Sequence, residues 1–426
     1  MRILYVSHYF PPEMGAPAGR VAGLARLWAE AGHEVHVLTG FPHHPTGRIH
    51  PDYREAFRRG FLRENFHGVS VHRTWIYPAP NRGKLRRSLN YGSFMASAAL
   101  TGSVRLPRPD VIVATSPQLL CAAAGALLSR RFRAPLVMEV RDLWPESLVA
   151  VGASGSRAPL VRMLETLAKS LYRRAAHIVT VTESQREAIV AGGIAADRVS
   201  VIPNGVDREF FDAGGTRPNG SQPFVVTYIG TLGMAHRLET LLDAAAEFRG
   251  DPSVRFRFVG EGARREALER HAREACLDNV EFVGERPRGE VPRWIAESGA
   301  CAVLLRKNEV FRTVVPSKML EIMAVGRPLL LGVEGEARQL LDRARAGIAI
   351  EPENAGQLVA AIRGLKSDPA RCLAFGQNGR EFVAREFLRE RLAAEYAALL
   401  ERLAVAPAAV QTAKPQKQID SVPESE

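Results

Sequence analysis

A lysine and a glutamate stand three residues apart in the segment TVVPSKMLEIMAVGRPLL, residues 313–330. In a helix, this spacing puts Lys318 and Glu321 on one face, near the positive end of the helix. A cation, free backbone amides and a carboxylate one turn deeper have the chemistry to hold a diphosphate followed by a ribose. The alternative is that both residues are ordinary surface charges.

The residues around this pair predict where the helix begins and ends. Pro316 suits the first helical position, and the hydroxyl of Ser317 can accept hydrogen bonds from the amides of the first turn. Gly326 suits the left-handed residue that stops a helix. The apolar run between them predicts a short helix with a capping residue at each end.

The apolar pattern of the N-terminal half predicts alternating strands and helices. RILYVS, a Gly/Pro loop, the amphipathic RVAGLARLWAEAG and HEVHVLTG form a βαβ unit. Parallel strands with crossover helices are expected to follow. The further strands are expected over 69–77, 110–116, 135–141 and 177–182, and the helices over 86–104, 118–131, 157–174 and 183–192.

The same pattern restarts after a stretch rich in Gly, Pro and polar residues. The sequence therefore predicts an α/β protein in which two Rossmann-like, doubly wound domains face a central cleft. The N-terminal domain is expected over 1–205, the linker over 206–223 and the C-terminal domain over 224–385. Helical residues 386–404 are expected to pack back on the first domain, and 405–426 to be disordered. The run AREFLRERLAAEYAALLERLA is expected to form one long helix.

Glycine-rich loops follow the first strand of each predicted domain, at 11–19 and 230–233. Open parallel sheets bind ligands beyond the carboxyl ends of their strands, so both loops are expected to face the cleft. Neither loop is a G-x-G-x-x-G fingerprint, which argues against a simple dinucleotide dehydrogenase.

The bulk composition limits the partners of the chain. Its 57 Lys and Arg outnumber 46 Asp and Glu, giving a net charge of +11 and a pI near 9.8. That balance fits contact with nucleotide-sugar phosphates, anionic lipids or nucleic acid. The basic residues are scattered without aromatic interleaving, which disfavours nucleic acid.

The cysteines and the N-terminus indicate the compartment. None of the four cysteines forms a Cys-x-x-Cys pair, so buried free thiols and a reducing compartment are expected. MRILYVSHYFPP reads as a strand and not as a signal peptide, and no window has 18 uninterrupted apolar residues. We expect a cytoplasmic protein that is soluble or lies on a membrane surface.

Six motifs follow one another along the chain, and their order and spacing up to about residue 404 resemble the retaining glycosyltransferases of family 4, which have the GT-B fold. These motifs are YFPPEMGAPAGR, PNGVD, YIGTLG, FVGEG, FVGERP and VPSKMLEIMAVGRPLL. SHYFPPEMGAPAGR, EVRDLWPES and PSKMLEIMAVGRP are similar to the WbuB/WcaI branch. That branch builds bacterial O-antigen or colanic-acid-type polysaccharides on a lipid diphosphate carrier, and its sugars include N-acetyl-fucosamine.

The resemblance implies which residues bind the donor sugar nucleotide. Glu321 matches the second glutamate of the family's Glu-x7-Glu signature and is expected to bind the ribose hydroxyls. The first glutamate is replaced by Thr313, whose hydroxyl makes an uncharged and weaker sugar contact. Glu309 is a possible substitute.

The family often grips the diphosphate with an arginine and a lysine, at positions where this chain has Thr231 and His236. Lys318 and Arg237 are therefore expected to stabilise the leaving diphosphate, ahead of Arg306. The Gly233 loop, His236 and the amides at Ser317 are also expected to contact the negatively charged diphosphate.

Residues of the N-terminal domain are expected to contact the donor phosphates and the acceptor. Gly15 lets the backbone approach the donor phosphates closely, and Arg20 is expected to meet a phosphate unless it is a solvated helix charge. Many family members have a histidine where Arg141 stands, so Asp142 becomes the first candidate for contacting the acceptor hydroxyl or the transferred sugar. The alternative is that Asp142 caps the next helix.

The adjacent histidines His43 and His44 make a poor metal site, because no cysteine or acidic cluster accompanies them. His44 is instead expected to line the acceptor side.

The expected reaction transfers a sugar, with retention, from a nucleoside-diphosphate sugar (UDP rather than GDP) to a polyprenyl-diphosphate-linked saccharide. The resemblance implies a front-face route without a metal, in which cations and helix N-termini stabilise the diphosphate.

Residues 82–105 combine cations with an aromatic and apolar helix, which suits the inner face of the cytoplasmic membrane. A buried helix with a charged start is the alternative there. A GT-B nucleotide-sugar epimerase and a catalytically impaired homologue are the competing functions.

Overall fold

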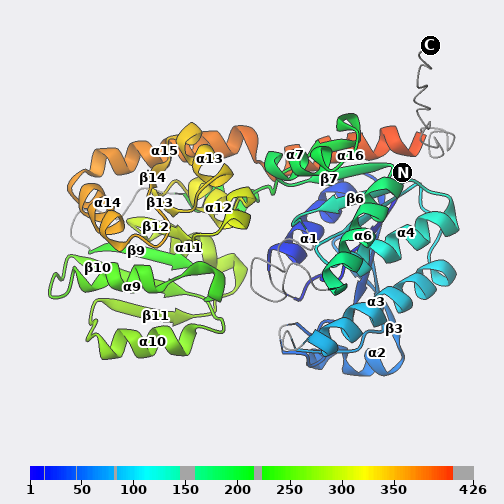
Figure 1. The fold of residues 1–426 in the computed structure, drawn as a ribbon, viewed down its shortest axis with the longest axis horizontal. Coiled ribbons are helices and arrows are strands. Elements are labelled where there is room, and N and C mark those ends of the chain that lie inside the picture. Colours follow the sequence, from blue (N-terminus) through cyan, green and yellow to red (C-terminus); the bar gives the residue numbers. More distant parts are fainter. Residues whose placement is uncertain (14, 45, 81–83, 144–158, 215–222, 406–426) are drawn as a thin grey trace, which may run out of the picture.

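The computed structural model describes residues 1–13, 15–44, 46–80, 84–143, 159–214 and 223–405. Two α/β domains lie side by side in it (Figure 1), so the predicted fold class is confirmed. Residues 144–147 of the motif EVRDLWPES and the tail 406–426 lie outside the described residues.

The N-terminal domain is built on an eight-stranded sheet with the order β3-β4-β2-β1-β5-β6-β7-β8. Every neighbouring pair is parallel except β3 and β4. The strands are β1 (Arg2–Val6), β2 (Glu34–Gly40), β3 (Phe61–Phe66), β4 (Val69–Thr74), β5 (Val111–Thr115), β6 (Leu136–Val140), β7 (His177–Thr180) and β8 (Val199–Val201).

Two of these strands, β3 and β8, are absent from the sequence prediction. β3 pairs antiparallel with β4 at the sheet edge, and its side chains alternate between partly buried and exposed. β8 has only three residues, too few for a periodic signal. The helices of this domain are α1 (Ala16–Glu30), α2 (Arg54–Arg58), α3 (Lys84–Arg105), α4 (Leu119–Phe132), α6 (Pro159–Arg174) and α7 (Glu183–Ala191).

The C-terminal domain has a six-stranded parallel sheet with the order β11-β10-β9-β12-β13-β14. Numbered within the domain, this is the order 3-2-1-4-5-6 of a dinucleotide-binding sheet, whose ligands lie where the order reverses, at β9 and β12. The strands are β9 (Phe224–Ile229), β10 (Val254–Val259), β11 (Val280–Gly284), β12 (Ala300–Leu304), β13 (Leu329–Gly332) and β14 (Gly347–Ala349). The helices are α8 (Arg208–Asp212), α9 (Glu239–Ala246), α10 (Arg265–Glu274), α11 (Val291–Ala296), α12 (Ser317–Val325), α13 (Glu336–Ala344), α14 (Ala355–Ser367) and α15 (Pro369–Glu386).

The expected single helix over 384–404 is wrong. Helix α15 ends at Glu386 and helix α16 (Arg389–Val405) begins three residues later. Between them, the carbonyl of Phe387 accepts from the amide of Val206, and the amide of Arg389 donates to the carbonyl of Val206. The helix therefore breaks where the chain passes back from the second domain to the first. Its backbone groups there pair with Val206, which lies on the segment where the chain first passes between the domains. These two segments are called the crossings.

The helices that follow the two crossings, α16 and α8, are held to their domains by apolar packing. Helix α16 packs against α1 and buries Leu392, Tyr396 and Leu400 in the core of the N-terminal sheet. Phe210 and Phe211 of α8, which fall within the expected linker, are instead buried in the C-terminal core beneath α12. The chain thus enters the second domain soon after Asp207.

The carboxyl ends of the two sheets face each other. Thr182, which follows β7, donates through Oγ1 to the carbonyl of Thr313, which precedes α12, at 3.1 Å. The amides of Glu183 and Ser184 both donate to the carboxylate of Glu336, at 2.9 Å. These contacts place the loops after the strands of both domains around one interdomain space.

Three of the cysteines are buried free thiols, as expected, but Cys276 is exposed, which corrects that part of the prediction. In the part of the chain that the structure describes, no helix is both long and apolar enough to cross a bilayer.

Candidate active site

Helix α12 begins the part of the candidate site that lies on the C-terminal domain. Its N-cap is Pro316 in an extended conformation, and its first helical residue is Ser317, without a side-chain cap. The predicted cap is therefore shifted by one residue, and the amides of the first turn are left without the Ser317 oxygen as an acceptor. At the other end, Gly326 adopts the left-handed conformation that the sequence predicts.

Lys318 is held over an aromatic ring at the start of this helix. Its Nζ donates to Tyr228 Oη at 2.8 Å and lies 4.2 Å from the centroid of the same ring. Tyr228 Oη in turn donates to the carbonyl of Thr231 at 2.8 Å, inside the loop after β9. Burial lowers the pKa of Lys318 to about 7, against the opposing effect of Glu321.

Glu321 lies one turn along the same helix, as predicted, and its side chain is 15% exposed. Its Oε1 accepts from Arg288 Nη2 at 3.0 Å. Sequence reasoning missed Arg288, because it lies 33 residues away on the η4 turn (Arg288–Glu290) and nothing local marks it.

The glycine loops bring the backbone close to this site. Gly230 has φ 134°, and a Cβ built on it would lie 3.0 Å from Lys318 Nζ. Gly260, at the end of β10, has φ 142°, and its Cβ would lie 2.0 Å from the carbonyl oxygen of Gly230. The two loops therefore pack backbone against backbone, which only residues without Cβ allow.

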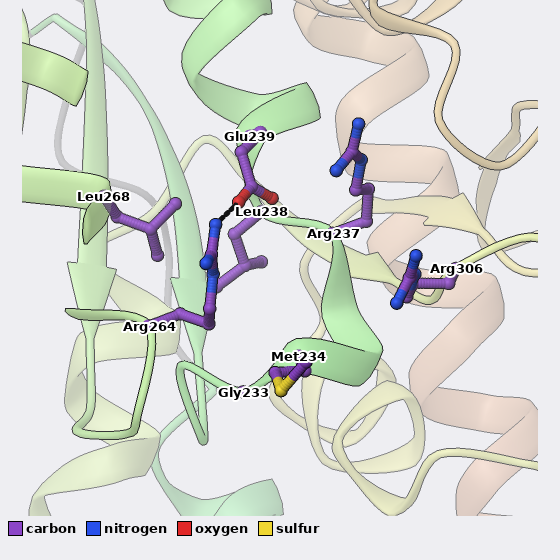
Figure 2. A pocket seen from close by; sticks show the side chains of 8 residues that line it. All are labelled: Gly233, Met234, Arg237, Leu238, Glu239, Arg264, Leu268 and Arg306. Carbon is purple, nitrogen blue, oxygen red and sulfur yellow. Dashed lines mark hydrogen bonds and ion pairs between the residues drawn. The ribbon is translucent and has the colours of Figure 1, made fainter. Parts of the chain in front are cut away.

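A pocket of about 140 Å³ lies beside the loop after β9 (Figure 2). Gly233, Arg237, Arg264 and Arg306 line it. Arg264 pairs with Glu239 across this pocket. The pocket gathers cations around the predicted diphosphate loop.

Arg237, predicted to stabilise the leaving group, adopts a left-handed conformation and lies 3.5 Å from Glu353. Its guanidinium is about half exposed, so it is accessible to an anion.

His236, on the η3 turn (Met234–His236), is buried enough to remain neutral. Burial, and then the charge of Lys318, lowers the pKa of its imidazole to about 4. Its Nδ1 lies 3.3 Å from the carbonyl of Leu304. Near neutral pH, His236 can therefore offer a hydrogen bond to a nucleotide but not a positive charge.

Thr313, predicted to replace a carboxylate, ends the η5 turn (Glu309–Thr313), and its Oγ1 donates to the carbonyl of Val310 at 3.1 Å. Glu309 lies on the same turn, is exposed and pairs with Arg312. The hydroxyl of Thr313 thus serves its own turn in this conformation.

The N-terminal domain contributes loops that follow β1, β2 and β6. Gly15, at φ 119°, is the N-cap of α1. The backbone amide of His44 donates to Glu13 Oε1, and its ring meets Tyr9 edge-on at 5.1 Å. Burial lowers the pKa of His44.

Asp142 and Arg141 come directly after β6, at the carboxyl edge of the sheet. Burial raises the pKa of Asp142, against the pull of the Arg141 charge. Arg141 Nε donates to the carbonyl of Ser116 at 3.1 Å. The proposed capping of the next helix by Asp142 concerns residues outside the described ranges.

Arg20 has a different position from the one expected. Its side chain is 2% exposed and pairs with the fully buried Glu139 at 3.0 Å. Its other nitrogens donate to the carbonyls of Ile202 and Pro203. Because its guanidinium is already saturated by the interior, Arg20 fixes the end of the N-terminal domain and is not placed to meet an acceptor phosphate.

A buried polar cluster links α3 to the loops after β1 and β2. Asn90 of α3 bonds His8 Nε2 at 3.0 Å and His43 Nε2 at 2.9 Å. Burial lowers the pKa of His8 to about 3, so this histidine is neutral. Sequence reasoning missed this cluster, since its members are far apart in the chain.

Among the described residues, no group of three or more His, Cys, Asp and Glu side chains is arranged to hold a metal ion. The described site gathers the cations Lys318, Arg237 and Arg306 near the loop after β9.

Comparison with known proteins places this geometry in a family. Residues 15–205 match the family model of the glycosyl transferase 4-like domain, and residues 216–382 match that of the glycosyl transferases group 1. The chain is 27% identical over 411 residues to WcaI of Escherichia coli K12, named for a role in colanic acid biosynthesis as a glycosyl transferase. This alignment covers 92% of this chain and 99% of WcaI.

Solved structures share the whole fold. A sucrose-phosphate synthase of Thermosynechococcus elongatus superposes with a TM-score of 0.74 at 21% identity, over 94% of this chain and 98% of the other. HepE of Anabaena in complex with UDP-glucose gives 0.69 at 18% identity, over 94% of this chain and all of HepE. The chain therefore belongs to the family 4 glycosyltransferases, enzymes with the GT-B fold.

Proposed function

We propose that the enzyme transfers a sugar, with retention, from a UDP-sugar to a saccharide linked to a lipid diphosphate, in the synthesis of a bacterial surface polysaccharide. The transferred sugar is N-acetyl-fucosamine or another deoxy or acetamido sugar. The observation that carries this proposal is helix α12, which presents Lys318 at its N-terminus and Glu321 one turn deeper.

The donor half of the proposal follows from the chemistry of these groups. The ammonium of Lys318 and the amides of the first turn of α12 can neutralise a departing diphosphate. A carboxylate one turn along can accept hydrogen bonds from the ribose diol. Arg237 and Arg306 add positive charge beside the same loop. A UDP donor is favoured because HepE, which shares the fold, was solved in complex with UDP-glucose.

The acceptor half rests on the exposed side of helix α3. Leu85, Leu89, Leu100 and Val104 are each at least half exposed. The opposite side of the helix is buried through Asn90, Phe94 and Ala98. The 22-residue helix thus carries an unpartnered apolar stripe along one side.

The flanks of this stripe suit a lipid headgroup region. Trp75 and Tyr77 are exposed beside α3, where Ser97 donates to the carbonyl of Trp75 and the amide of Tyr77 donates to Ser93. Arg86 and Arg87 lie at one end and Arg105 at the other. Aromatic rings and cations around an apolar stripe favour an anionic bilayer surface, where a polyprenyl-linked acceptor resides.

Donor turnover tests the proposal. Purified enzyme is given UDP-sugars in turn, with EDTA present, and the release of UDP is measured with and without a polyprenyl-diphosphate saccharide. We expect release that depends on the lipid acceptor and persists in EDTA. Interconversion of the sugar without acceptor would support the epimerase alternative, and binding without turnover would support the catalytically impaired one.

The binding model has its own test. Glu321→Ala is expected to lower the affinity for UDP by at least about tenfold, since hydrogen bonds to a charged group contribute about 1.5–3 kcal/mol. Unchanged affinity in this variant would contradict the assignment of the ribose ligand.

A further inference from the structure

The first turns of helix α3 lie against the end of β1. Four residues there stand at spacings that share one face of a helix: Arg87, Asn90, Tyr91 and Phe94. Asn90 bonds His8, which follows β1. The rings of Tyr91 and Phe94 lie 5.2 Å and 4.8 Å from the ring of His8. This face of α3 therefore borders the carboxyl edge of the N-terminal sheet, whereas the apolar stripe of the same helix is exposed.

The loops beside this face are fixed by a buried carboxylate and a buried amide. Glu13 Oε1 accepts from the backbone amides of His43 and His44, both at 2.9 Å, which joins the loop after β1 to the loop after β2. Asn90 joins α3 to the same two loops, because its side chain bonds both His8 and His43. The end of α3 and the two loops thus form one wall of the interdomain space.

Two buried acceptor atoms in this wall have no partner among the described residues. The amide nitrogen of Asn90 faces the carbonyl of Tyr77 at 2.7 Å, so the amide oxygen accepts from Nε2 of His8. The other nitrogen of the neutral His8 ring, Nδ1, is then an unpaired acceptor, and Glu13 Oε2 is the second such atom. Buried polar groups are rarely left unpaired. A saccharide carries the hydroxyl donors that such acceptors bind.

Partly exposed aromatic rings surround this buried cluster. The ring of Tyr9 lies 4.7 Å from that of His8, and the ring of His44 lies 5.1 Å from that of Tyr9, each edge to face. Tyr91 meets His8 edge-on from the side of α3. An aromatic side chain offers an apolar face together with a polar edge. The three partly exposed rings therefore suit a sugar, whose C–H groups are apolar and whose hydroxyls are polar.

Arg87 brings a positive charge to these rings. Its guanidinium lies 5.9 Å from the centroid of the Tyr91 ring, one turn further along the helix. Burial raises the pKa of Tyr9, and the charge of Arg87 opposes that rise, so Arg87 also lies near Tyr9. Arg87 is partly buried, whereas its neighbour Arg86 is exposed. Of these two adjacent cations, Arg87 is therefore the one that faces the wall.

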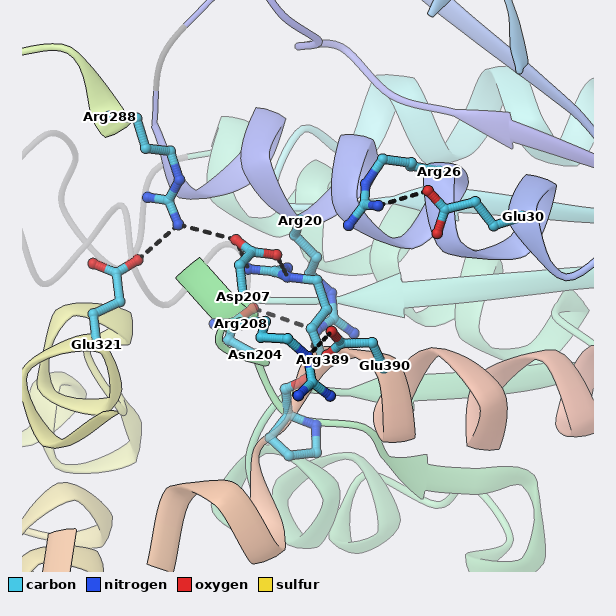
Figure 3. Close-up of polar contacts among 11 residues, drawn as sticks. Arg20, Arg26, Glu30, Asn204, Asp207, Arg208, Arg288, Glu321, Arg389 and Glu390 are labelled. Atoms are coloured by element: carbon cyan, nitrogen blue, oxygen red, sulfur yellow. Dashed lines mark hydrogen bonds and ion pairs between the residues drawn. The ribbon is translucent and has the colours of Figure 1, made fainter. Parts of the chain in front are cut away.

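The charge of Arg87 is not neutralised by an acid. Among the residues that the structure describes, no carboxylate forms an ion pair with it. Arginines at the junction of the two domains differ in this respect, since Arg288 pairs with Glu321 and Arg389 pairs with Asp207 (Figure 3). The guanidinium donors of Arg87 are therefore available for an anion.

We propose that Arg87 binds the diphosphate of the lipid-linked acceptor, and that Tyr9, Tyr91 and His44 contact the saccharide that follows it. This inference rests on the proposed function. A guanidinium binds phosphate oxygens through two parallel hydrogen bonds. The exposed apolar stripe of α3 begins in the same turn, at Leu85. One helix thus serves the lipid, the diphosphate and the saccharide of the acceptor in turn.

Binding of an isoprenyl probe without a sugar tests the diphosphate contact. The full chain is saturated with UDP, so that the proposed donor site is filled, and its affinities for farnesyl diphosphate and for farnesol are measured by calorimetry in neutral detergent. We expect the wild type to prefer the diphosphate by at least about tenfold, and Arg87→Ala to lose that preference. Arg87→Lys keeps the charge without the planar fork, and is expected to recover part of the preference.

Arg86→Ala is the matched control, because it removes the same charge from the adjacent, exposed position. Both variants are expected to bind phosphatidylglycerol vesicles more weakly than the wild type, but only Arg87→Ala is expected to lose the preference for farnesyl diphosphate. Tyr91→Leu tests the saccharide contact. It is expected to keep most of that preference and to raise KM for the acceptor several-fold in the UDP-release assay, with kcat little changed.

A wild type without preference for the diphosphate, or equal behaviour of the two arginine variants in detergent, would overturn the inference. So would displacement of farnesyl diphosphate by an equal concentration of phosphatidylglycerol, which would make Arg87 a general headgroup contact. A matching loss of farnesol binding in Arg87→Ala would show a structural role and overturn it as well, and an unchanged KM in Tyr91→Leu would overturn the saccharide contact.

If the Arg87→Ala protein does not fold, Arg87→Gln and Arg87→Lys decide the matter. UDP binding that stays intact in all these cases leaves the proposed donor site standing. A wild-type enzyme that binds no UDP would instead overturn the proposed function, and this inference with it.

Discussion

Lys318 shows how one residue of the proposed donor site carries charge at a cost to stability. In the folded protein its ammonium is held by Tyr228 in a poorly solvated position, and burial brings its pKa to about 7 instead of the usual 10.5. A diphosphate beside Lys318 would stabilise its ammonium charge and so offset the effect of burial on its pKa. Burying the charged Lys318 therefore costs the protein less free energy when an anion is bound.

We predict that Lys318→Met abolishes tight UDP binding but stabilises the empty enzyme by about 1 kcal/mol at pH 6, a trade of activity for stability. Below pH 7 both the folded and the unfolded chain hold the Lys318 proton, so the full penalty of burying the charge is present. Between pH 7 and about 10 the folded chain releases this proton first, so the penalty shrinks as the pH rises.

Thermal unfolding of both proteins across this pH range checks the stability prediction. The affinity advantage of wild type over Lys318→Met for UDP should also decline as the pH rises from 6 to 8. This comparison cancels the titration of UDP itself. A stability difference that grows with pH would contradict the assigned protonation of Lys318.

For individual residues, the sequence predicted contacts between neighbours in the chain but not contacts between residues far apart in it. The spacing of Lys318 and Glu321 within one helix was sufficient to place them together. Arg288 was not predictable, because only the folded chain brings it to Glu321. Arg20 was misplaced for the same reason, since its partner Glu139 is 119 residues away.

The paired glycine loops of the C-terminal domain act as one element. The loop after β10 lies directly against the loop after β9, where Gly260 meets the carbonyl of Gly230. Any side chain at Gly260 would push the loop after β9, and the positive φ of Gly260 is strained for other residues. The loops can therefore hold their shape only as a pair.

We predict that Gly260→Ala lowers the free energy of unfolding by about 2 kcal/mol or more and weakens UDP binding. Gly364→Ala is the matched control, because Gly364 lies within α14 with no atom within 4 Å of its built Cβ. That change is expected to raise stability by about 0.5–1 kcal/mol. Urea denaturation and calorimetry with UDP measure both; equal stability of the two variants would refute the close packing.

Helix α3 carries a prediction about the membrane. The double variant Leu89→Glu, Leu100→Glu places two charges on the exposed apolar stripe and is expected to reduce binding to anionic vesicles by at least about tenfold. UDP binding should be unchanged, since the proposed donor site lies on the other domain. Co-sedimentation with phosphatidylglycerol vesicles measures the first effect.

Leu373→Glu serves as the control for this variant, because Leu373 is an equally exposed leucine on α15 of the C-terminal domain. It is expected to sediment with vesicles like wild type. Vesicle binding that survives in the α3 variant would exclude this stripe as the contact surface.

Helices and strands with a full apolar face were predictable, while elements set by tertiary pairing were not. The periodic runs of the central strands of both sheets gave their positions to within a few residues. Continuous helical periodicity over 384–404 hid the break at Phe387, because the break is caused by pairing with Val206. The antiparallel edge strand β3 lacked a buried face to reveal it.

In the described residues, two doubly wound sheets meet at the crossings and through side chains such as Glu336. The restart of the strand–helix pattern after the linker was enough to predict this architecture. Which groups join the domains was not predictable, since Glu336 meets Ser184 across 152 residues. We expect these contacts to limit how far the cleft opens.

Glu336 caps a helix of the opposite domain. Its two oxygens accept from the amides of Glu183 and Ser184, the first residues of α7, at 2.9 Å. It therefore satisfies two orphan amides and faces the positive end of that helix. A carboxylate in this position holds the domains together at the edge of the site, beside the contact between Thr182 and Thr313.

We predict that Glu336→Ala loosens the two domains, because an N-cap contributes about 1 kcal/mol and nothing else on α13 replaces it. The radius of gyration in solution scattering should increase, and UDP-sugar should be hydrolysed faster without acceptor, because a more open cleft admits water. Glu334→Ala removes the same charge two residues earlier, in the loop before α13, and should change neither quantity. An unchanged radius of gyration and hydrolysis rate in Glu336→Ala would mean that the crossings alone, and not this interdomain cap, set the distance between the domains.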